Sequence, residues 1–193
     1  MAASGAITPG AGGPLAGPAP GRDRVLGRPP AGAGYWAVST AALGAAEAAG
    51  LSHRVIRHGP VRSLAQAARA RGVAPADVVK TLVVRRGDDD FVFVLVPGDR
   101  ALSWPKLRRL LGVSRLSLPA AEVARQATGY ERGTITPFGS ARPWPVIADE
   151  RLRGRTITLG AGEHGLALAA DADAILRALN ASVADISDPE PVS

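Results

Sequence analysis

The sequence predicts a mixed α/β domain in which a largely antiparallel β-sheet is flanked by helices. Short helical and strand-like segments alternate along the chain. Several strand-like segments are joined by only a few residues, so those pairs must be antiparallel, because a parallel pair needs a long crossover connection. One segment, residues 91–96, is apolar at every position, which is typical of a strand buried on both faces.

The first 34 residues differ from the rest in composition. Gly, Ala and Pro occupy 23 of these positions, and large apolar side chains are nearly absent. Such a segment buries too little apolar surface to offset the entropy lost on folding. We interpret residues 1–34 as a disordered tail or an upstream extension of the true start site. The folded domain is expected over residues 35–187, with a short C-terminal tail at 188–193.

Capping residues and glycines mark the first half of the domain. The expected elements are a helix capped by Ser39 or Thr40 and ending near Gly50, a strand at 53–57, and a helix from the capping-box residue Ser63 to Gly72. Next, β-branched and apolar runs at 81–86 and 91–96 flank a turn rich in Gly and Asp, which predicts a β-hairpin.

Shorter elements are expected in the second half. They are a helix at 104–111 capped by Ser103 and closed by Gly112, a helix from Pro119 to near Gly129, a loop at 130–145, strands at 145–149, 155–159 and 165–170, and a helix at about 171–180.

Composition excludes several classes of function. The chain has no Cys, which excludes disulfides, a thiol nucleophile and thiolate metal sites. His53, His58 and His164 form no metal-ligand pattern, so neither a metal nor another cofactor is expected. Residues 160–165 match G-x-G-x-x-G but lead into a strand-like segment, so they do not predict a dinucleotide site. No apolar run reaches the roughly 18 residues of a membrane-spanning helix, and we expect a cytoplasmic protein.

Basic residues are concentrated in the middle of the chain. Residues 51–150 carry 16 Lys or Arg and 9 Asp or Glu, a net charge of +7, whereas residues 151–193 have a net charge of −2. This asymmetry suggests an anionic partner such as RNA or a nucleotide. Only two of the 23 basic residues are lysines: Lys106, expected on the surface, and Lys80, beside an apolar strand. Lys80 is either a compact point charge in a site or an edge-strand lysine whose amine reaches solvent.

Six motifs occur in a characteristic order. They are Val79–Val84 (VKTLVV), Leu95–Asp99 (LVPGD), Thr128–Tyr130 (TGY), Gly133–Gly139 (GTITPFG), Val146–Glu150 (VIADE) and the glycine turn at 160–165. Over about residues 40–187 the chain therefore resembles the YbaK/EbsC family of prolyl-tRNA editing domains. The resemblance implies a mixed sheet with one pocket for the aminoacylated 3′ end of a tRNA. It also implies a deacylase that acts in trans and hydrolyses mischarged tRNA, typically tRNA(Pro) carrying Cys or Ala.

The resemblance also implies the site residues. Lys80 and Gly133 are the expected catalytic residues: Lys80 binds a terminal phosphate or polarises the ester carbonyl, and backbone N–H groups near Gly133 and Gly162 stabilise the oxyanion. The attacking group is water, a tRNA 2′-hydroxyl or the substrate's own side chain. The residues expected to bind substrate are His58, Thr136, Pro137, Phe138, Gly160, Ala161 and Gly162. Gly160 stands where many relatives have Ser, and His58 where some have an aromatic residue, so recognition of the aminoacyl group is affected most.

The expected partners are the acceptor end of an aminoacyl-tRNA and, as a further candidate, prolyl-tRNA synthetase. Neither a membrane nor DNA is expected. Two other functions remain open. One is a non-catalytic RNA- or nucleotide-binding module, which needs the Arg-rich surface but no chemistry. The other is an accessory protein that binds a synthetase.

Deletion of residues 1–34 tests the expected domain boundary. We expect the truncated protein to keep the melting temperature and the activity of the full chain, because the deleted segment has no core-forming residues. Thermal unfolding of the two proteins, followed by circular dichroism, measures this. A melting temperature several degrees lower after truncation would show that the segment makes stabilising contacts.

Overall fold

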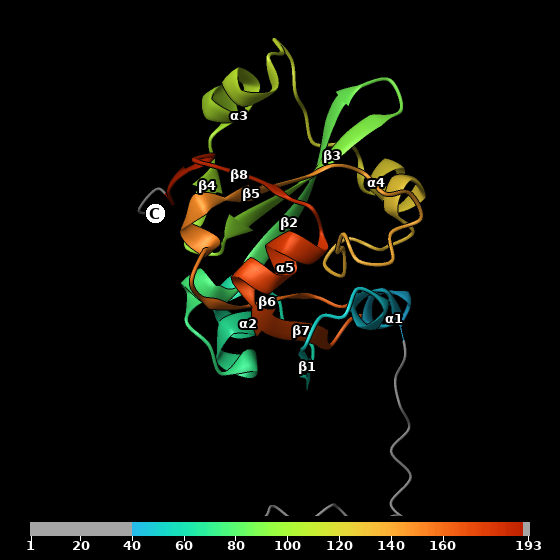
Figure 1. The fold of residues 1–193 in the computed structure, drawn as a ribbon, viewed down its shortest axis with the longest axis vertical. Coiled ribbons are helices and arrows are strands. Elements are labelled where there is room, and N and C mark those ends of the chain that lie inside the picture. Colours follow the sequence, from blue (N-terminus) through green and yellow to red (C-terminus); the bar gives the residue numbers. More distant parts are fainter. Residues whose placement is uncertain (1–39, 191–193) are drawn as a thin grey trace, which may run out of the picture. The chain divides into compact units, whose positions relative to one another are not determined.

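The computed structural model describes residues 40–190 of the 193-residue chain (Figure 1). The expected tail at 1–34 and the expected domain start at residue 35 lie outside the described residues. Within the described range, no helix is both long and apolar enough to cross a bilayer.

The helices are α1 (Ala41–Ala48), α2 (Leu64–Arg71), α3 (Trp104–Leu111), α4 (Ala121–Thr128) and α5 (Ala172–Ala178), with 3-10 helices η1 (Pro75–Asp77) and η2 (Glu150–Leu152). The strands are β1 (Arg54–Arg57), β2 (Val79–Gly87), β3 (Asp90–Pro97), β4 (Arg100–Leu102), β5 (Val146–Asp149), β6 (Thr156–Gly160), β7 (Leu166–Asp171), β8 (Ser182–Ala184) and β9 (Ser187–Pro189).

These strands form three sheets. The largest has the order β2-β3-β5-β8, the second has the order β1-β7-β6, and β4 pairs with β9. Four of the strand pairs are antiparallel, and β3–β5 and β5–β8 are parallel. Figure 1 shows α3 and the β2–β3 hairpin at one end of the domain and α1 with β1 and β7 at the other. The predicted mixed α/β class with a largely antiparallel sheet is confirmed.

Strand β3 runs through the centre of the core. Each residue from Phe91 to Val96 is at most 3% exposed, as their uninterrupted apolar sequence predicts. Successive side chains of a strand point to opposite faces. The odd-numbered residues therefore join a large cluster with α1, α4, α5 and the β6–β7 pair, while the even-numbered residues join a smaller cluster around Leu107 of α3. One strand thus holds the two cores together.

Most element predictions are confirmed within a few residues. Thr40 caps α1 and Ser63 caps α2, each by accepting a hydrogen bond from the backbone N–H of the third residue after it. Helices α2, α3 and α4 end at glycines with a positive φ, as their sequences predict. The hydroxyls of Thr40 and Ser63 each accept a hydrogen bond from a backbone N–H group that has no partner inside its own helix.

Some predictions differ from the structure. Ser103 precedes α3 but makes no side-chain cap bond, and α4 begins at Ala121 instead of Pro119. Strands β4, β8 and β9 were not predicted, because three residues are too few to show a periodic pattern. Strand β9 pairs with β4 and runs to Pro189, so the folded part extends past the expected boundary at residue 187.

A buried carboxylate anchors the C-terminal segment. The side chain of Asp149, at the end of β5, is fully buried. It accepts hydrogen bonds from Ser187 Oγ at 2.7 Å and from the Ile186 N–H at 3.3 Å. Arg151 supplies the positive charge, with its guanidinium 3.3 Å from the Asp149 carboxylate. These contacts join β5 to the chain just before and at the start of β9.

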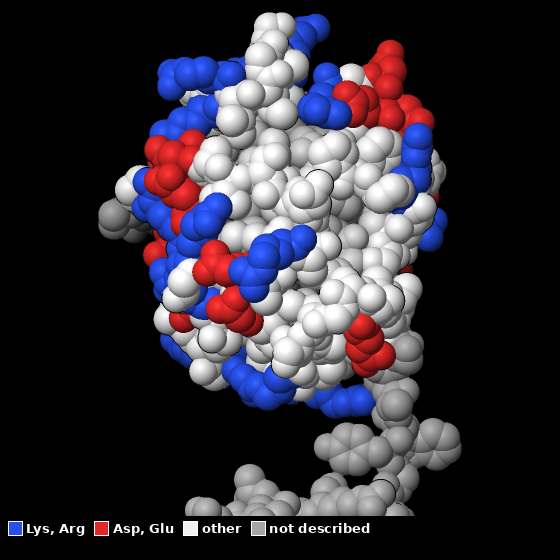
Figure 2. Space-filling view, in the orientation of Figure 1, with Lys and Arg blue, Asp and Glu red and all other residues white. Residues whose placement is uncertain are grey.

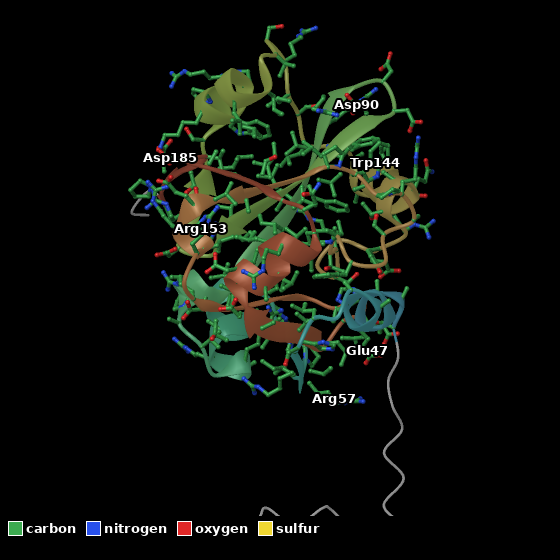
Figure 3. The ribbon with its side chains drawn as sticks, in the orientation of Figure 1. Glu47, Arg57, Asp90, Trp144, Arg153 and Asp185 are labelled. Atoms are coloured by element: carbon green, nitrogen blue, oxygen red, sulfur yellow. The ribbon has the colours of Figure 1, made fainter. Side chains whose placement is uncertain are left out.

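Lys106 holds the same segment from the other side. Its Nζ forms ion pairs with Asp185, labelled in Figure 3, at 3.1 Å and with Asp188 at 2.8 Å. Hydrogen bonds to Asp188 and Asp185 raise the pKa of the Lys106 amine. Nζ also donates to the Ser187 carbonyl at 2.8 Å. Lys106 lies at the surface as expected, and there it fixes the position of β9.

Gly98 permits the close packing of the turn after β3, which suggests a stability test. A Cβ atom at this position would overlap the carbonyl oxygen of Pro75 and lie 2.8 Å from that of Val78. Backbone atoms cannot move aside as a flexible side chain can. We therefore expect Gly98→Ala to lower the free energy of unfolding by roughly 1–3 kcal/mol, the usual cost of overpacking.

Urea denaturation of wild type and Gly98→Ala measures this effect. The matched control is Gly59→Ala, because a Cβ atom there would meet nothing within 4 Å. Equal denaturation midpoints for the two variants would contradict the packing argument.

Candidate functional site

Two adjoining cavities lie at the beginning of edge strand β2, with volumes of about 780 and 280 Å³. The larger extends toward His58 and His164, and the smaller toward Thr81 and Gly160. Both are lined by Arg71, Val78, Lys80, Arg132 and Gly133. The structure therefore brings the two expected catalytic residues, Lys80 and Gly133, to one place, together with His58 and Gly160.

Lys80 faces this site from an edge strand. It pairs with Val96 of β3, and its side chain is 26% exposed. Its Nζ lies 2.7 Å from Oε2 of Glu190. The ammonium group is thus at a cavity wall and is bound to a carboxylate from the far end of the chain. Sequence reasoning did not anticipate this contact, because 110 residues separate the two partners.

Arg71, the last residue of α2, is a second cation that the sequence did not single out. Its Nη1 donates to Thr158 Oγ1 at 3.3 Å, and its Nε donates to His58 Nε2 at 3.4 Å. Burial lowers the pKa of its guanidinium. Among residues 40–190 no carboxylate lies within ion-pair distance of it. A partly buried cation without a counterion favours a site for an anion.

His58 positions this arginine. Its Nδ1 lies 2.8 Å from the carbonyl oxygen of Gly59, and its Nε2 faces Arg71. A neutral ring with the proton on Nδ1 satisfies both contacts, because Nδ1–H then donates and Nε2 accepts. The imidazole at the cavity wall therefore orients the guanidinium.

Gly133 occupies a position where two loops meet. Its φ is +95°, in the region that favours glycine. A Cβ atom on Gly133 would lie 3.5 Å from Cε1 of His164, in the glycine turn at 160–165. His164 Nε2 in turn lies 3.4 Å from Glu131. Close approach of these loops forms one side of the larger cavity.

At Gly160 the glycine turn packs closely against the loop that follows Gly133. A Cβ atom at this position would lie 2.9 Å from the carbonyl oxygen of Thr134 and 3.2 Å from that of Ile135. A serine here would require the loop to shift. The absence of a side chain at 160 is therefore coupled to the path of the backbone at 134–135.

Five of the residues expected to bind substrate line neither cavity. They are Thr136, Pro137, Phe138, Ala161 and Gly162. Thr136, Phe138 and Ala161 are buried, and the carbonyl oxygens of the last two accept hydrogen bonds from Tyr130 Oη and Thr40 Oγ1.

The backbone N–H of Gly162 is not free to take the role expected of it. Its N–H, expected to stabilise an oxyanion, donates instead to the carbonyl of Thr134 at 3.2 Å. Burial of Thr136, Phe138 and Ala161 in the core and the hydrogen bond of Gly162 are the physical reasons why these four residues do not face the cavity.

Thr81 is a further side chain that the sequence did not indicate. Its Oγ1 is buried and has no hydrogen-bond partner among the described residues. Thr81 lines the smaller cavity, next to Lys80 in the chain. Buried hydroxyls nearly always have a partner, so a ligand in this cavity is a natural partner for Thr81.

Comparison with known proteins identifies the family of this chain and several similar proteins. The family model for the aminoacyl-tRNA editing domain matches residues 58–178. The proline–tRNA ligase of Heliobacterium modesticaldum is 38% identical over 84 residues, which are 44% of this chain and only 14% of the ligase. A candidate Cys-tRNA(Pro)/Cys-tRNA(Cys) deacylase of Enterococcus faecalis, EbsC, is 27% identical over 124 residues, which are 64% of this chain and 76% of that protein.

Solved structures give the same result. A candidate trans-editing enzyme for prolyl-tRNA synthetase has a TM-score of 0.71 and 29% sequence identity, over 78% of this chain and 99% of that one. The hypothetical protein APE2540 has a TM-score of 0.69 and 29% identity, over 74% of this chain and 96% of that one. The similarity therefore covers nearly the full length of both solved chains.

The ion pair between Lys80 and Glu190 suggests a binding test. The Glu190 side chain is 54% exposed, so the pair contributes little to stability. We expect Glu190→Gln to leave the melting temperature nearly unchanged and to lower the Kd for inorganic phosphate several-fold, because Lys80 loses a competing carboxylate. Isothermal titration calorimetry measures the affinity.

Glu122→Gln is the control, since Glu122 lies on α4 and lines neither cavity. If phosphate binds wild type and Glu190→Gln equally well, the carboxylate does not compete for Lys80.

Proposed function

Because the chain belongs to the aminoacyl-tRNA editing domain family, we propose that it hydrolyses the ester bond of mischarged aminoacyl-tRNA in trans. The proposed substrate is tRNA(Pro) carrying Cys or Ala. The name of the Enterococcus relative, which concerns Cys-tRNA(Pro) and Cys-tRNA(Cys), supports Cys as one of the two aminoacyl groups. The matched segment of proline–tRNA ligase supports tRNA(Pro) and makes prolyl-tRNA synthetase a candidate partner. A chain that acts on charged tRNA is expected to work in the cytoplasm, where translation takes place.

The observation that carries this proposal is the pair of cations at one cavity. Lys80 and Arg71 both line the two adjoining cavities. The 3′ end of an aminoacyl-tRNA presents a phosphodiester and a neighbouring ester. The planar fork of Arg71 suits two phosphate oxygens, whereas the compact ammonium of Lys80 suits a single oxygen atom. We assign the phosphate to Arg71 and the ester carbonyl to Lys80.

The reaction then needs little further chemistry from the protein. The attacking oxygen bonds to the ester carbonyl carbon, negative charge develops on the carbonyl oxygen, and the bond to the ribose oxygen breaks. Water as the attacking group gives the free amino acid and a tRNA with a free hydroxyl. One well-placed donor to the developing oxyanion stabilises the transition state by about 3–4 kcal/mol. Lys80 is that donor, and the absence of Cys from the chain agrees with a mechanism without a thiol nucleophile.

Other residues of the cavities position the substrate. Thr81 has a buried hydroxyl without a partner among residues 40–190, and we assign it to a polar group of the aminoacylated adenosine. His58 keeps Arg71 in place through its Nε2. At Gly160 the carbonyls of residues 134 and 135 leave no room for a Cβ atom, and we assign this glycine to shaping the wall of the smaller cavity.

The Lys80–Glu190 ion pair favours a second candidate function, a non-catalytic RNA-binding module. In that function Lys80 serves as an anchor for phosphate and performs no chemistry. Rate and affinity measurements on Lys80 variants separate the two functions.

Substitution of Lys80 tests the proposed catalysis. We expect Lys80→Arg to reduce the deacylation rate on the order of a hundredfold, because displacement of a catalytic group by about 1 Å has this effect. We expect Lys80→Ala to reduce the rate by at least as much, because it removes the oxyanion donor. The measurement is the single-turnover rate on tRNA(Pro) charged with Cys, Ala, Ser or Pro. Lys106→Arg is the matched control, since Lys106 lines neither cavity, and circular dichroism confirms folding.

The outcomes distinguish the roles of the lysine. Lost rate with retained tRNA affinity assigns Lys80 to the transition state, whereas parallel loss of both makes it a phosphate anchor. Wild-type rates in both variants would remove Lys80 from the mechanism and favour the binding module.

A further inference from the structure

A second, arginine-rich cavity lies at the opposite end of strand β2. It has a volume of about 630 Å³, and four of its lining residues are arginines: Arg85, Arg86, Arg108 and Arg115. Asp88 is the only acidic lining residue, so the formal charge of the lining is +3. Figure 2 shows basic side chains gathered at the end of the molecule that carries α3, beside the acidic tip of the β2–β3 hairpin. Nothing in the proposed reaction uses this cavity.

The two arginines on the hairpin have weak internal partners. Arg85 pairs with Asp88, whose side chain is fully exposed, and Arg86 pairs with Asp90, labelled in Figure 3. Exposed ion pairs of this kind contribute about 0–1 kcal/mol, so an incoming anion displaces them at little cost.

The two arginines on the other wall are free of such pairs. Among the described residues, neither Arg108 of α3 nor Arg115 of the following loop forms an ion pair. Forked guanidinium groups on two walls of one cavity are suited to phosphate oxygens.

A hollow along the outer edge of β2 adjoins the smaller cavity at Lys80 and reaches toward the Arg85–Ser117 backbone bridge, whose residues line the arginine-rich cavity. This hollow has a volume of about 190 Å³ and shares Thr81, Arg132, Gly133 and Ile135 with the smaller cavity. Its far end is lined by Leu118, next to Ser117 of the arginine-rich cavity. We refer to the cavities at Lys80, this hollow and the arginine-rich cavity together as the groove. Lys80 and Arg85 are five residues apart on one strand, which corresponds to roughly 17 Å. Most of the residues that line this hollow are apolar, among them Leu82, Leu118 and Ile135.

We propose that this groove binds the RNA backbone leading to the aminoacylated 3′ end, with a phosphate held by Arg85, Arg86, Arg108 and Arg115. The inference rests on the proposed function, because it assumes that the ester lies beside Lys80. Single-stranded RNA of a few nucleotides spans the distance between the two ends of β2. The bases lie over the apolar hollow, and the charge of the far cavity determines which way the strand runs from the ester.

A double variant tests this groove against a matched control. The variant is Arg108→Ala with Arg115→Ala, and the control is Arg109→Ala, which removes an exposed arginine next to Arg108 that lines none of these cavities. Fluorescence anisotropy over a range of salt concentrations gives the Kd for uncharged tRNA(Pro). Deacylation is measured on the full aminoacyl-tRNA and on an aminoacyl ester of adenosine, which has no RNA chain.

We expect the double variant to raise the Kd at least tenfold and the control to leave it nearly unchanged. Each lost phosphate contact lowers the slope of log K against log salt by roughly 0.7 for single-stranded RNA, so the slope of the double variant, which loses one phosphate contact, should be about 0.7 less steep. Its rate on full aminoacyl-tRNA should fall at subsaturating concentrations, while its rate on the adenosine ester should equal that of wild type.

Two results would overturn the proposal: an unchanged Kd in the double variant, or an equal loss in Arg109→Ala, which would reflect net charge alone. Failure of the proposed function gives a different pattern. In that case wild type hydrolyses neither substrate, and the double variant still weakens tRNA binding if the groove is correctly assigned. Circular dichroism spectra of the three proteins show whether they are equally folded.

Discussion

Burial of both faces of strand β3 is the constraint on which the rest of the structure depends. Its apolar residues place one face in the larger core and the other in the smaller core beneath α3. Burial of each large side chain stabilises the fold by roughly 1.5–3 kcal/mol. A shift of one residue in register would exchange the two faces, so the pairing of β3 with β2 is fixed. That pairing in turn places Lys80 opposite Val96 at the edge of the sheet.

The outer edge of β2 lines the cavities of the candidate site. An unpaired strand edge is a liability in a folded protein, because its free N–H and C=O groups can pair with another chain. Here Arg85 exchanges two backbone hydrogen bonds with Ser117, and the loops around Gly133 and Leu118 flank the rest of the edge. These loops cover the edge without pairing along its whole length, and the space left between them and the strand forms the cavities. The same arrangement therefore protects the edge and creates the groove.

The sequence predicted the parts of this site that depend on local patterns or on rarity. Lys80 could be recognised because the chain has only two lysines, and the family motifs brought Gly133 to attention. Arg71 could not be recognised, because it is one of 21 arginines and its burial depends on the distant partner Thr158. The motifs also predicted more site residues than line the cavities. Thr136 and Ala161 belong to the motifs, yet both are buried. The pairing of β4 with β9 was unpredictable for the same reason, since it arises from contacts between distant residues.

The C-terminal segment connects the stability of the fold to the surroundings of Lys80. Buried Asp149 and the amine of Lys106 fix the beginning of β9, and the segment then continues to Glu190, whose carboxylate meets Lys80. A phosphate or a developing oxyanion must share or replace that carboxylate. Because Glu190 is half exposed, the exchange of one anion for another requires little desolvation. Among residues 40–190, Arg71 has no carboxylate partner, whereas Lys80 is paired with Glu190. In the proposed function an anionic substrate therefore meets Arg71 without competition and must compete with Glu190 for Lys80. The difference between the two cations follows from which of them already has a counterion.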